Sequence, residues 1–443
     1  MGAEVYKNSY DSLVPLTKVY VDLNAIAHNV SALKALCAPG TAMMAVVKAN
    51  GYGHGSVAIA RTALENGASF LGVARISEAV VLREASIDAP MLLFGDAHPS
   101  QIPWLSAHDV RVTVTSLENA RLIAHTASGM GKKIKVHVKV DTGMGRFGFM
   151  SISSRLDQTI DEIMKIMELD AIFVEGIYTH FANADSKEIT HAGVQIGRFN
   201  AILDELESRG KKPAISHAAN SAATIGHPDS HFNMVRPGIS IYGLWPSHDM
   251  KLNKVFLDRK DTVLNLDAAD MGRNATALDF DAVDVEGGAA AFDPKSFYLE
   301  PAMSIVSKII HLKSVPAGFE VSYGSTYVTS IPTKIATVPI GYADGYSRLL
   351  SSRGHMLVRG KRAFVAGRVC MDFTMIDVGH IPDVASGDEV VIMGKQDKEE
   401  ISADEIASHT GTINYEVVAS LTGRMPVKYL RGDSMVGNLS EPE

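Results

Sequence analysis

The chain has 443 residues, of which 46% are hydrophobic and 21% charged, and its formal net charge is −8 at pH 7. This balance is typical of a folded globular protein, and the mild negative charge argues against a protein that binds the phosphate backbone of nucleic acids. Two cysteines are too few for a disulfide framework, and no apolar run reaches the roughly 18 residues that span a bilayer. The polar segment 1–13 lacks the apolar core of a secretory signal, so we expect a cytoplasmic protein.

The first half of the chain alternates short apolar runs with amphipathic, helix-like stretches. Eight alternations within about 200 residues favour a (β/α)8 barrel, whereas the competing dinucleotide-binding fold lacks its glycine-rich motif after any strand. The predicted strands are Met43–Val47, Phe70–Val73, Pro90–Phe94, Val110–Thr115, Ile134–Val140, Ile172–Thr179, Ala214–His217 and Val235–Tyr242.

The pattern changes after Gly243. Residues 247–300 contain eight aspartates from Asp258 to Asp293, which predicts a loop-like, solvated acidic insertion. A calcium loop would need a glycine and a glutamate that this segment does not offer at the required positions.

Beyond the insertion, short β-rich runs recur with one clear helix, Ser402–His409. The predicted fold class is therefore α/β, with an N-terminal (β/α)8, TIM-like barrel (18–246), an insertion or linker (247–300) and a C-terminal mainly-β domain (301–443, with 1–17). The predicted strands of this last part are Ile305–Leu312, Ile335–Val338, Arg362–Val365, Thr374–Val378 and Val390–Met393.

A lysine stands at the C-terminal end of the first predicted barrel strand. Met43–Val47 leads directly into Lys48, followed by a stretch that contains three glycines. Barrels of this type place their chemistry at the C-terminal ends of the strands, and an apolar flank lowers the pKa of a lysine because burial disfavours the ammonium. A neutral amine can attack a carbonyl group, so Lys48 is a candidate catalytic residue. The alternative is a surface lysine that caps the strand.

The segment Val47–Gly55 resembles the lysine signature of the alanine racemase family, and further motifs of that family follow in order. The resemblance covers about residues 18–246 and 300–430, and it associates the segment Lys18–Leu23 with the β domain. The main departure is the insertion near 247–300, which is longer than the usual connection. The matching motifs are Val138–Arg146, Tyr178–Ala182, His217–Ala222, Val235–Ile239, Val321–Tyr327, Ile340–Gly345, Gly367–Asp372 and Ile413–Glu416.

This resemblance implies an isomerase that interconverts L-alanine and D-alanine with pyridoxal 5′-phosphate. Racemisation needs an electron sink for the departing α-proton and one base on each face of the substrate. In the family pattern Lys48 carries the cofactor and is the base for the D-face, while Tyr323 is the base for the L-face. A phenol needs a nearby cation or hydrogen-bond partner to act as a base at neutral pH. The family places His180 beside the tyrosine, and Arg236 behind His180, as these partners. Without the family pattern, Tyr323 is a packed strand tyrosine.

The resemblance also implies the cofactor contacts. Arg236 would point at the pyridine nitrogen, where a guanidinium donates a hydrogen bond and keeps its proton. The nitrogen would then stay unprotonated, which weakens the electron sink and suppresses transamination. A Pro-Gly turn after a strand suits backbone amides that face an anion. The expected phosphate contacts are the Ser221 hydroxyl, the amides of Gly238 and Ile239, and the hydroxyls of Tyr52 and Tyr415.

Four further positions match family residues near the substrate. Arg146 follows a Gly-Met-Gly turn and would bind the substrate carboxylate or orient the catalytic tyrosine, and the backbone amide of Met371 would be a second carboxylate contact. Tyr342 and Arg348 would line the entrance and favour a small side chain.

Lys139 matches a position that is carbamylated in some family members, where it would position Arg146. An unmodified lysine that faces Asp141 is an equally good interpretation.

The family pattern predicts a homodimer in which Lys48 and Tyr323 of one active site come from different subunits. We expect no nucleic acid, membrane or metal partner. A zinc triad of His54, His180 and His217 would lack a close pair of histidines at ligand spacing.

Several alternatives share the scaffold. A serine or broad-specificity racemase remains open, because a pocket sized for alanine rejects one added hydroxyl only weakly. A cofactor carrier would consist of a barrel alone, and a related decarboxylase would present a catalytic cysteine, whereas Cys370 lies in the racemase pattern Cys-Met-Asp. A metal-dependent aldolase would need a metal pair near the C-terminus. If the activity is alanine racemisation, D-alanine would supply bacterial peptidoglycan precursors.

Overall fold

The computed structural model describes residues 15–186, 190–252, 297–432 and 434–436. Within these ranges the chain forms two compact units. The barrel unit takes its residues from 26–49 and 60–300, and the β unit takes its residues from 1–25, 50–59 and 301–440. None of the helices in the described ranges is both long and apolar enough to cross a membrane.

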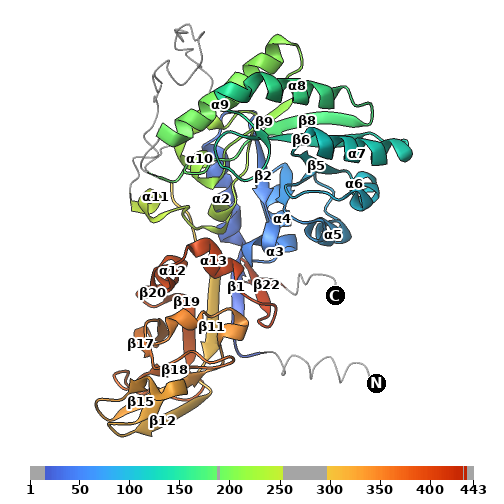
Figure 1. Ribbon diagram of the computed structural model, residues 1–443. Helices are drawn as coiled ribbons and strands as arrows, with labels where there is room; N and C mark the ends of the chain where they lie inside the picture. Colours follow the sequence, from blue (N-terminus) through green and yellow to red (C-terminus); the bar gives the residue numbers. More distant parts are fainter. Residues whose placement is uncertain (1–14, 187–189, 253–296, 433, 437–443) are drawn as a thin grey trace, which may run out of the picture. The chain divides into compact units, whose positions relative to one another are not determined.

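The barrel unit contains a closed ring of eight parallel strands (Figure 1). The ring closes because β5 pairs with both β4 and β6, while β10 pairs with both β9 and β2. The predicted eight-stranded barrel is therefore confirmed. Its strands are β2 (Ala42–Val46), β3 (Phe70–Val73), β4 (Met91–Leu93), β5 (Val110–Val114), β6 (Ile134–Asp141), β8 (Ile172–Tyr178), β9 (Ile215–His217) and β10 (Met234–Val235).

Helices follow most of the barrel strands, and their sequences show why they form. The Ser116 hydroxyl accepts a hydrogen bond from the backbone N–H of Asn119 and so caps α7, and α8 buries Ile160, Ile163 and Ile166 along one face. One helix, α2 (Leu23–Ala35), precedes the first barrel strand. The helices that come after barrel strands are α4 (Ser56–Glu65), α5 (Ile76–Glu84), α6 (Ile102–Ala107), α7 (Leu117–Gly129), α8 (Leu156–Met167), α9 (Thr190–Ser208), α10 (Ser221–Gly226) and α11 (His248–Leu252).

Two predicted segments differ from the structure in this unit. The predicted strand Val235–Tyr242 ends at Val235, and a 3-10 turn, Ile239–Tyr242, follows, because Pro237 removes a ladder donor and Gly238 breaks the extended path. The predicted loop 247–300 begins with α11, and its residues 253–296 lie outside the described ranges.

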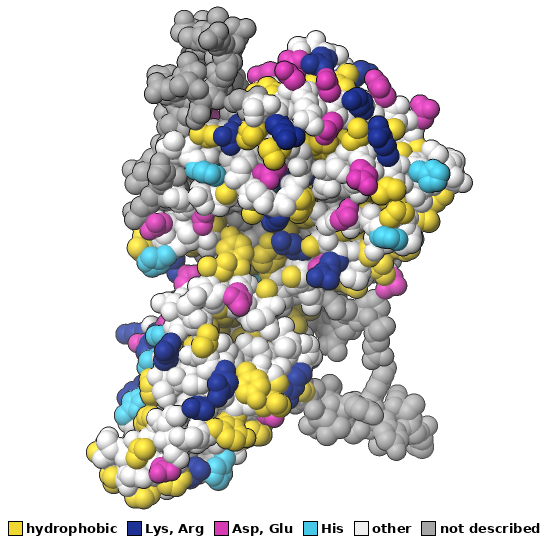
Figure 2. All heavy atoms as spheres, viewed as in Figure 1, with side chains coloured by type: hydrophobic (Ala, Val, Ile, Leu, Met, Phe, Trp, Pro, Cys, Tyr) yellow, Lys and Arg dark blue, Asp and Glu magenta, His cyan; other side chains and the backbone are white. Residues whose placement is uncertain are grey.

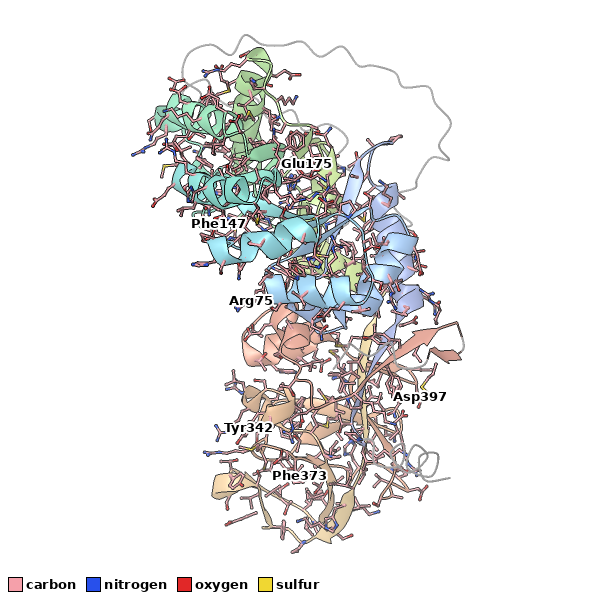
Figure 3. The ribbon with its side chains drawn as sticks, turned by 90° about the vertical axis from the view of Figure 1, so that its right-hand side faces the viewer. Arg75, Phe147, Glu175, Tyr342, Phe373 and Asp397 are labelled. Carbon is pink, nitrogen blue, oxygen red and sulfur yellow. The ribbon has the colours of Figure 1, made fainter. Side chains whose placement is uncertain are left out.

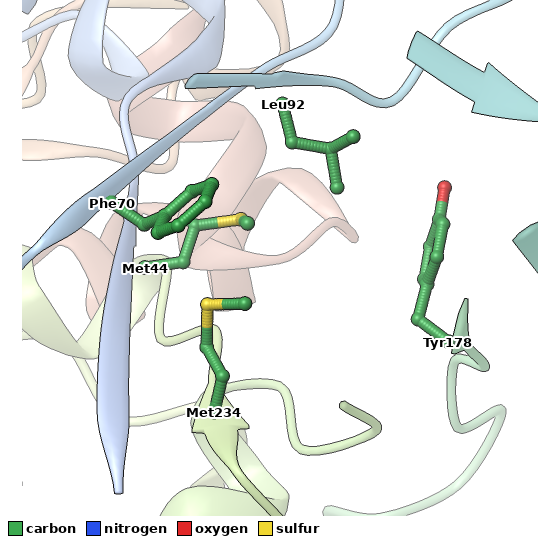
Figure 4. Packing of buried hydrophobic residues seen from close by; sticks show 5 residues of the cluster. All are labelled: Met44, Phe70, Leu92, Tyr178 and Met234. Atoms are coloured by element: carbon green, nitrogen blue, oxygen red, sulfur yellow. The ribbon is translucent and has the colours of Figure 1, made fainter. Parts of the chain in front are cut away.

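The interior of the barrel is packed with side chains. Five buried residues from different strands form a cluster: Met44, Phe70, Leu92, Tyr178 and Met234. Figure 4 shows the side chains of Met44, Phe70 and Met234 close together, with Leu92 and Tyr178 farther out. A filled barrel leaves the strand ends and their loops as the place for chemistry. On the face seen in Figure 2, acidic and basic side chains are interspersed over the barrel unit, consistent with the small net charge.

The β unit is built on one large sheet, which confirms the predicted mainly-β C-terminal domain. The sheet runs in the order β12-β15-β18-β17-β16-β19-β11-β1-β21-β22, and β20 pairs with β19. Its strands are β1 (Lys18–Asp22), β11 (Met303–Lys308), β12 (His311–Val315), β15 (Thr333–Val338), β16 (His355–Val358), β17 (Lys361–Val365), β18 (Thr374–Asp377), β19 (Glu389–Gln396), β20 (Glu399–Ile401), β21 (Val427–Arg431) and β22 (Ser434–Val436).

The first strand of the chain, β1, lies between strands from the C-terminal part. It pairs antiparallel with β11 and parallel with β21, with Val21 opposite Met303 and Tyr429. Val19 and Val21 are buried, so this strand contributes alternate side chains to the core of the β unit. The predicted single run Ile305–Leu312 is wrong, since it divides into β11 and β12.

Smaller elements complete the β unit. The predicted helix at Ser402–His409 is present as α12 (Ala403–Thr410), capped by the Ser402 hydroxyl, which accepts from the N–H of Glu405. A further helix, α13 (Asn414–Ala419), is an addition to the elements predicted from sequence. A short hairpin, β13 (Glu320–Val321) and β14 (Tyr327–Val328), flanks the turn that carries Tyr323.

Candidate active site

Lys48 lies two residues after Val46, the last residue of the buried strand β2. Burial lowers the pKa of its amine, and the nearby positive charge of Arg146 lowers it further, while Glu78 opposes the shift. The same strand end is fixed to its neighbours, since Val46 donates a backbone hydrogen bond to Pro237 (3.1 Å) and Val47 donates one to Gly72 (2.9 Å). The structure therefore places on a fixed strand end a lysine that loses its proton more readily than an exposed lysine does.

The backbone after Lys48 makes a left-handed turn, α3 (Lys48–Tyr52). Ala49, Asn50, Gly51 and Tyr52 have φ values from 51° to 58°. This conformation costs non-glycine residues roughly 1–2 kcal/mol each, and such strain persists only where surrounding contacts hold it.

Two side chains hold the left-handed turn. The Glu78 carboxylate accepts a hydrogen bond from the N–H of Ala49 (2.7 Å), and Asn50 Oδ1 accepts one from the N–H of Ser56 (2.7 Å). Sequence reasoning missed both supporting roles, because the strain that they hold is not visible in the residue types.

Arg236 is buried behind the ends of β8, β9 and β10. Its Nη1 donates to His217 Nδ1 (2.8 Å), and its Nη2 donates to the carbonyl oxygens of Thr179 (2.7 Å) and Ala218 (3.0 Å) and lies 3.4 Å from His180 Nδ1. Burial lowers the pKa of Arg236 to about 10, so the guanidinium remains charged at neutral pH. Burial also holds the pKa of His180 well below its usual value, and the charge of Arg236 adds to this effect.

Ser221, Gly238 and Ile239 lie together after the last two barrel strands, but the amide of Gly238, expected to contact phosphate, is already used within the turn. Ser221 Oγ accepts hydrogen bonds from the N–H groups of Gly238 (2.8 Å) and Ser240 (3.3 Å), which leaves its own O–H free to donate. Ile239 begins a 3-10 turn, where no earlier turn accepts its N–H. The Ser240 hydroxyl is buried and, among the described residues, has no hydrogen-bond partner. Such a cradle of donors suits an anion.

Lys139 and Arg146 flank a turn organised by Asp141. Its Oδ1 accepts hydrogen bonds from the N–H groups of Gly143 (3.0 Å), Met144 (2.9 Å) and Gly145 (3.1 Å). Lys139 is 1% exposed, and burial lowers its pKa to about 7 against the opposing charge of Asp141. Its amine is thus partly neutral near physiological pH.

The predicted site residues of the β unit lie on connected turns. Tyr323 is 70% exposed, and the hydroxyl of the preceding Ser322 donates to the carbonyl of Arg368 (2.6 Å). Tyr342 donates its backbone N–H to the carbonyl of Cys370 (3.1 Å), one residue before the exposed Met371. These bonds connect the turns that carry Tyr323, Tyr342 and Met371 within the β unit, where Figure 3 labels Tyr342 and Phe373.

Two further expectations concern the same unit. Tyr52 and Tyr415, both expected to contact phosphate, have ring centroids 6.3 Å apart. Arg348 lies exposed in a 3-10 turn, Arg348–Leu350.

A group of potential metal ligands, His355, Glu405 and His409, also lies in the β unit, with ligand atoms within 4.8 Å of one another. Both carboxylate oxygens of Glu405 are already bonded by Arg362, at 2.6 and 3.0 Å, so we assign no metal to this cluster.

Comparison with known families gives a consistent result over both units. The family model described as the alanine racemase N-terminal domain matches residues 21–246, and the family model of the alanine racemase C-terminal domain matches residues 302–429. An alanine racemase of Desulfosudis oleivorans is 45% identical over 418 residues, which is 94% of this chain and 96% of the relative. An alanine racemase of Methanococcus maripaludis is 42% identical over 413 residues, 93% of this chain and 97% of the relative.

Solved structures agree. The crystal structure of alanine racemase from Bacillus anthracis with bound L-Ala-P has a TM-score of 0.81 and 36% identity, and the match covers 95% of this chain and 97% of that one. The structure of alanine racemase from E. faecalis has a TM-score of 0.78 and 35% identity, with 94% and 98% covered.

Proposed function

The chain belongs to the alanine racemase family, and we propose that it interconverts L-alanine and D-alanine by two-base proton transfer with pyridoxal 5′-phosphate as cofactor. One observation carries the proposal. The barrel strands β9, β10 and β2 are neighbours, and their ends carry the Ser221–Gly238 cradle and Lys48. The hydrogen bond from Val46 to Pro237 links the two parts of the site directly.

The residues present fit this cofactor. Lys48 offers an amine whose pKa is lowered, and the Ser221 hydroxyl and the Ile239 amide offer donors for a phosphate. The buried, unpartnered hydroxyl of Ser240 adds a donor at the same turn. Tyr52 and Tyr415 would supply phenolic hydroxyls to the same phosphate. When bound, pyridoxal 5′-phosphate supplies the electron sink for the charge that develops as the α-proton leaves.

Arg236 acts as a fixed hydrogen-bond donor toward the pyridine nitrogen. Because a guanidinium does not give up its proton at neutral pH, it would leave that nitrogen unprotonated. Four acceptors on β8, β9 and the loops after them hold Arg236 in place. A weak electron sink favours return of the proton over transfer of the amino group, which is the selectivity that a racemase needs.

Two bases exchange the α-proton. Lys48 serves the D-face, and Tyr323, with His180 and Arg236 as its helpers, serves the L-face. His180 stays neutral because it is buried beside a cation, so it can accept or pass a hydrogen bond without storing a charge. Arg146 binds or orients the substrate carboxylate, with Lys139 behind it and the N–H of Met371 as a second contact.

The assembly proposed for this activity is a homodimer with shared active sites. Large hydrophobic side chains are exposed on the β unit, where a second copy would cover them: Tyr323 (70%), Leu349 (59%), Met371 (53%) and Phe373 (44%). Tyr342 and Arg348 narrow the entrance and favour alanine. The reaction would take place in the cytoplasm, and its D-alanine would enter peptidoglycan precursors.

The test combines a spectrum, a trapping reaction and a chiral assay on the purified protein. Visible absorbance reports bound cofactor, and borohydride reduction followed by peptide mass spectrometry should find the cofactor on the Lys48 peptide. Lys48→Ala should lose both signals and all racemase activity. Tyr323→Phe should keep both signals and lower kcat with alanine by about 10²–10⁴-fold, the usual worth of a general base.

L-Serine and L-lysine serve as rival substrates in the same assay. Cofactor fixed by borohydride to a lysine other than Lys48 would contradict the assignment of Lys48 as the residue that carries the cofactor. A protein that binds the cofactor but turns over serine faster than alanine would contradict the substrate assignment alone.

A further inference from the structure

A chain of hydrogen bonds runs through the barrel interior from Arg236 to Glu175. Arg236 Nη1 lies 2.8 Å from His217 Nδ1, His217 Nε2 lies 2.8 Å from His137 Nδ1, and His137 Nε2 lies 3.2 Å from Glu175 Oε2. The four residues come from adjacent strands, β10 with its following loop, β9, β6 and β8, and Figure 3 labels Glu175 in the barrel unit. His137 and His217 have no exposed surface, and Arg236 is 4% exposed.

Each hydrogen bond of this chain has only one possible direction. A guanidinium donates and cannot accept, so His217 Nδ1 must be the acceptor. A neutral imidazole carries one N–H, which places the proton of His217 on Nε2, where it donates to His137 Nδ1. By the same argument His137 carries its proton on Nε2 and donates to Glu175. The order of donors therefore runs from Arg236 to Glu175 without a break.

The protonation states agree with this order. Burial lowers the pKa of both His137 and His217, so both rings are neutral at pH 7. Burial opposes ionisation of Glu175, but hydrogen bonds from His137 and Arg111 and the charge of Arg111 outweigh it and lower the pKa of Glu175 to about 2. The chain thus ends on a carboxylate that can only accept.

The surroundings hold Glu175 and His137 rigidly. Arg111 donates to both oxygens of Glu175, at 2.8 and 3.1 Å. The ring of His137 packs directly on Gly176, where a Cβ atom would lie only 2.6 Å from it. In the described part of the chain Arg236 makes no ion pair with a carboxylate, so the acidic end of this chain is the counter-charge that reaches it through hydrogen bonds.

We propose that His137 and Glu175 are positioning residues for Arg236. Glu175 fixes both imidazoles in the Nε2–H form, so that His217 presents a lone pair to the guanidinium and holds it as a donor toward the cofactor. This inference rests on the role of Arg236 in the proposed function. With both ends in place, a reversed chain would lose the hydrogen bonds at Arg236 and at Glu175. Without the carboxylate, reversal loses only the bond at Arg236, where an Nδ1–H of His217 would face an N–H of the guanidinium and release it from one of its acceptors.

The experiment measures the tautomers directly. Protein labelled with ¹⁵N in its histidine rings, studied by NMR at pH 7 as purified, should show His217 and His137 with protonated Nε2 and unprotonated Nδ1. The ring signals of His217 and His137 are identified by their absence from the spectra of His217→Gln and His137→Gln. A proton on Nδ1 of either ring in the unmodified protein would overturn the proposal, whatever any variant does.

Glu175→Gln removes the charge but keeps the shape, and an amide can donate as well as accept. It should mix or reverse the tautomers of both histidines. In the holoenzyme with L-alanine, it should raise pyruvate formation relative to racemisation by about tenfold or more, the scale of one lost hydrogen bond to a charged group. Pyruvate is released as the amino group passes to the cofactor, so pyridoxamine 5′-phosphate should appear in equal amount.

Asp109→Asn is the matched control. Asp109 also bonds Arg111 (2.8 Å), so this variant removes the same charge from the same network without touching His137. It should leave the tautomers and the product ratio unchanged, and an effect as large as that of Glu175→Gln would overturn the proposal. The proposal would also be overturned if His137 and His217 kept the same tautomers in Glu175→Gln. A protein that lacks racemase activity altogether contradicts the proposed function, while the tautomer measurement still decides this inference.

Discussion

At the scale of single residues, Gly53 and Gly55 leave no room for side chains in the segment after Lys48. Gly53 has φ 81°, and a Cβ atom there would lie 2.1 Å from the carbonyl oxygen of Val418. Gly55 has φ 91°, and its Cβ would lie 1.8 Å from Tyr429 Oη. Both contacts are made within the β unit, so these glycines fix the segment 50–59 against that unit.

We predict that Gly53→Ala destabilises the protein by about 1–3 kcal/mol more than Gly40→Ala. Gly40 has a similar φ of 86°, but a Cβ atom added there would have no heavy atom within 4 Å, so Gly40→Ala carries the backbone strain without the collision. Urea unfolding of both variants gives the difference. If the two variants lost the same free energy of unfolding, the collision with Val418 would be relieved without a cost in stability.

The candidate site was predictable from sequence only where the residue types carry their own chemistry. Lys48 at a strand end is visible in the sequence, since an apolar run and three glycines frame it. His137 and Glu175 are not, because each lies within a strand whose partners come from distant parts of the chain. The available signal was a polar residue inside an otherwise apolar strand, which predicts a buried hydrogen bond without naming its partner.

At the scale of elements, the barrel strands were predictable because parallel strands covered on both faces form continuous apolar runs. The predicted run Val110–Thr115 differs from β5 by one residue. The left-handed turn α3 was not predictable, because its conformation depends on Glu78, which lies on α5. The division of Ile305–Leu312 into β11 and β12 also escapes periodicity, because the two residues that connect the strands, Ile309 and Ile310, are themselves apolar.

At the scale of the whole molecule, several buried groups make stability depend on pH. Burial lowers the pKa of His54 to about 4 and holds those of His180 and His217 well below the usual value. Below about pH 6.5 the unfolded chain takes up protons that the folded chain refuses. Glu175, with a folded pKa of about 2, contributes stability that is present above about pH 4.3 and is lost as pH falls toward 2.

We therefore predict that the urea midpoint falls steadily from pH 7 to pH 5 and more steeply below pH 4. His98→Gln is the control, because His98 is exposed and should leave this dependence unchanged. His54→Gln should make it shallower by removing one buried imidazole. A midpoint that rises between pH 7 and pH 5 would contradict the assignment of these histidines as neutral in the folded protein.

The proposed shared active site predicts complementation between two inactive variants. In a mixed dimer of Lys48→Ala and Tyr323→Phe, one site would combine the intact Lys48 and the intact Tyr323. Random co-assembly of the two chains should restore about a quarter of the wild-type activity, because about half of the dimers are mixed and each has one complete site of two. Chiral chromatography of alanine measures the recovery. No recovery, with mixed dimers demonstrated by mass spectrometry, would mean that both bases come from one chain.

The position of β1 between β11 and β21 sets an order of events during synthesis. The strand leaves the ribosome before the barrel, whereas both of its partners, β11 and β21, are made after the barrel. At about 5–20 residues per second the strand waits for roughly tens of seconds with both edges unpaired while the whole barrel is made. The β unit is therefore the last part of a nascent chain to close, and a chain released early would expose β1 to chaperones, proteases and other copies of itself.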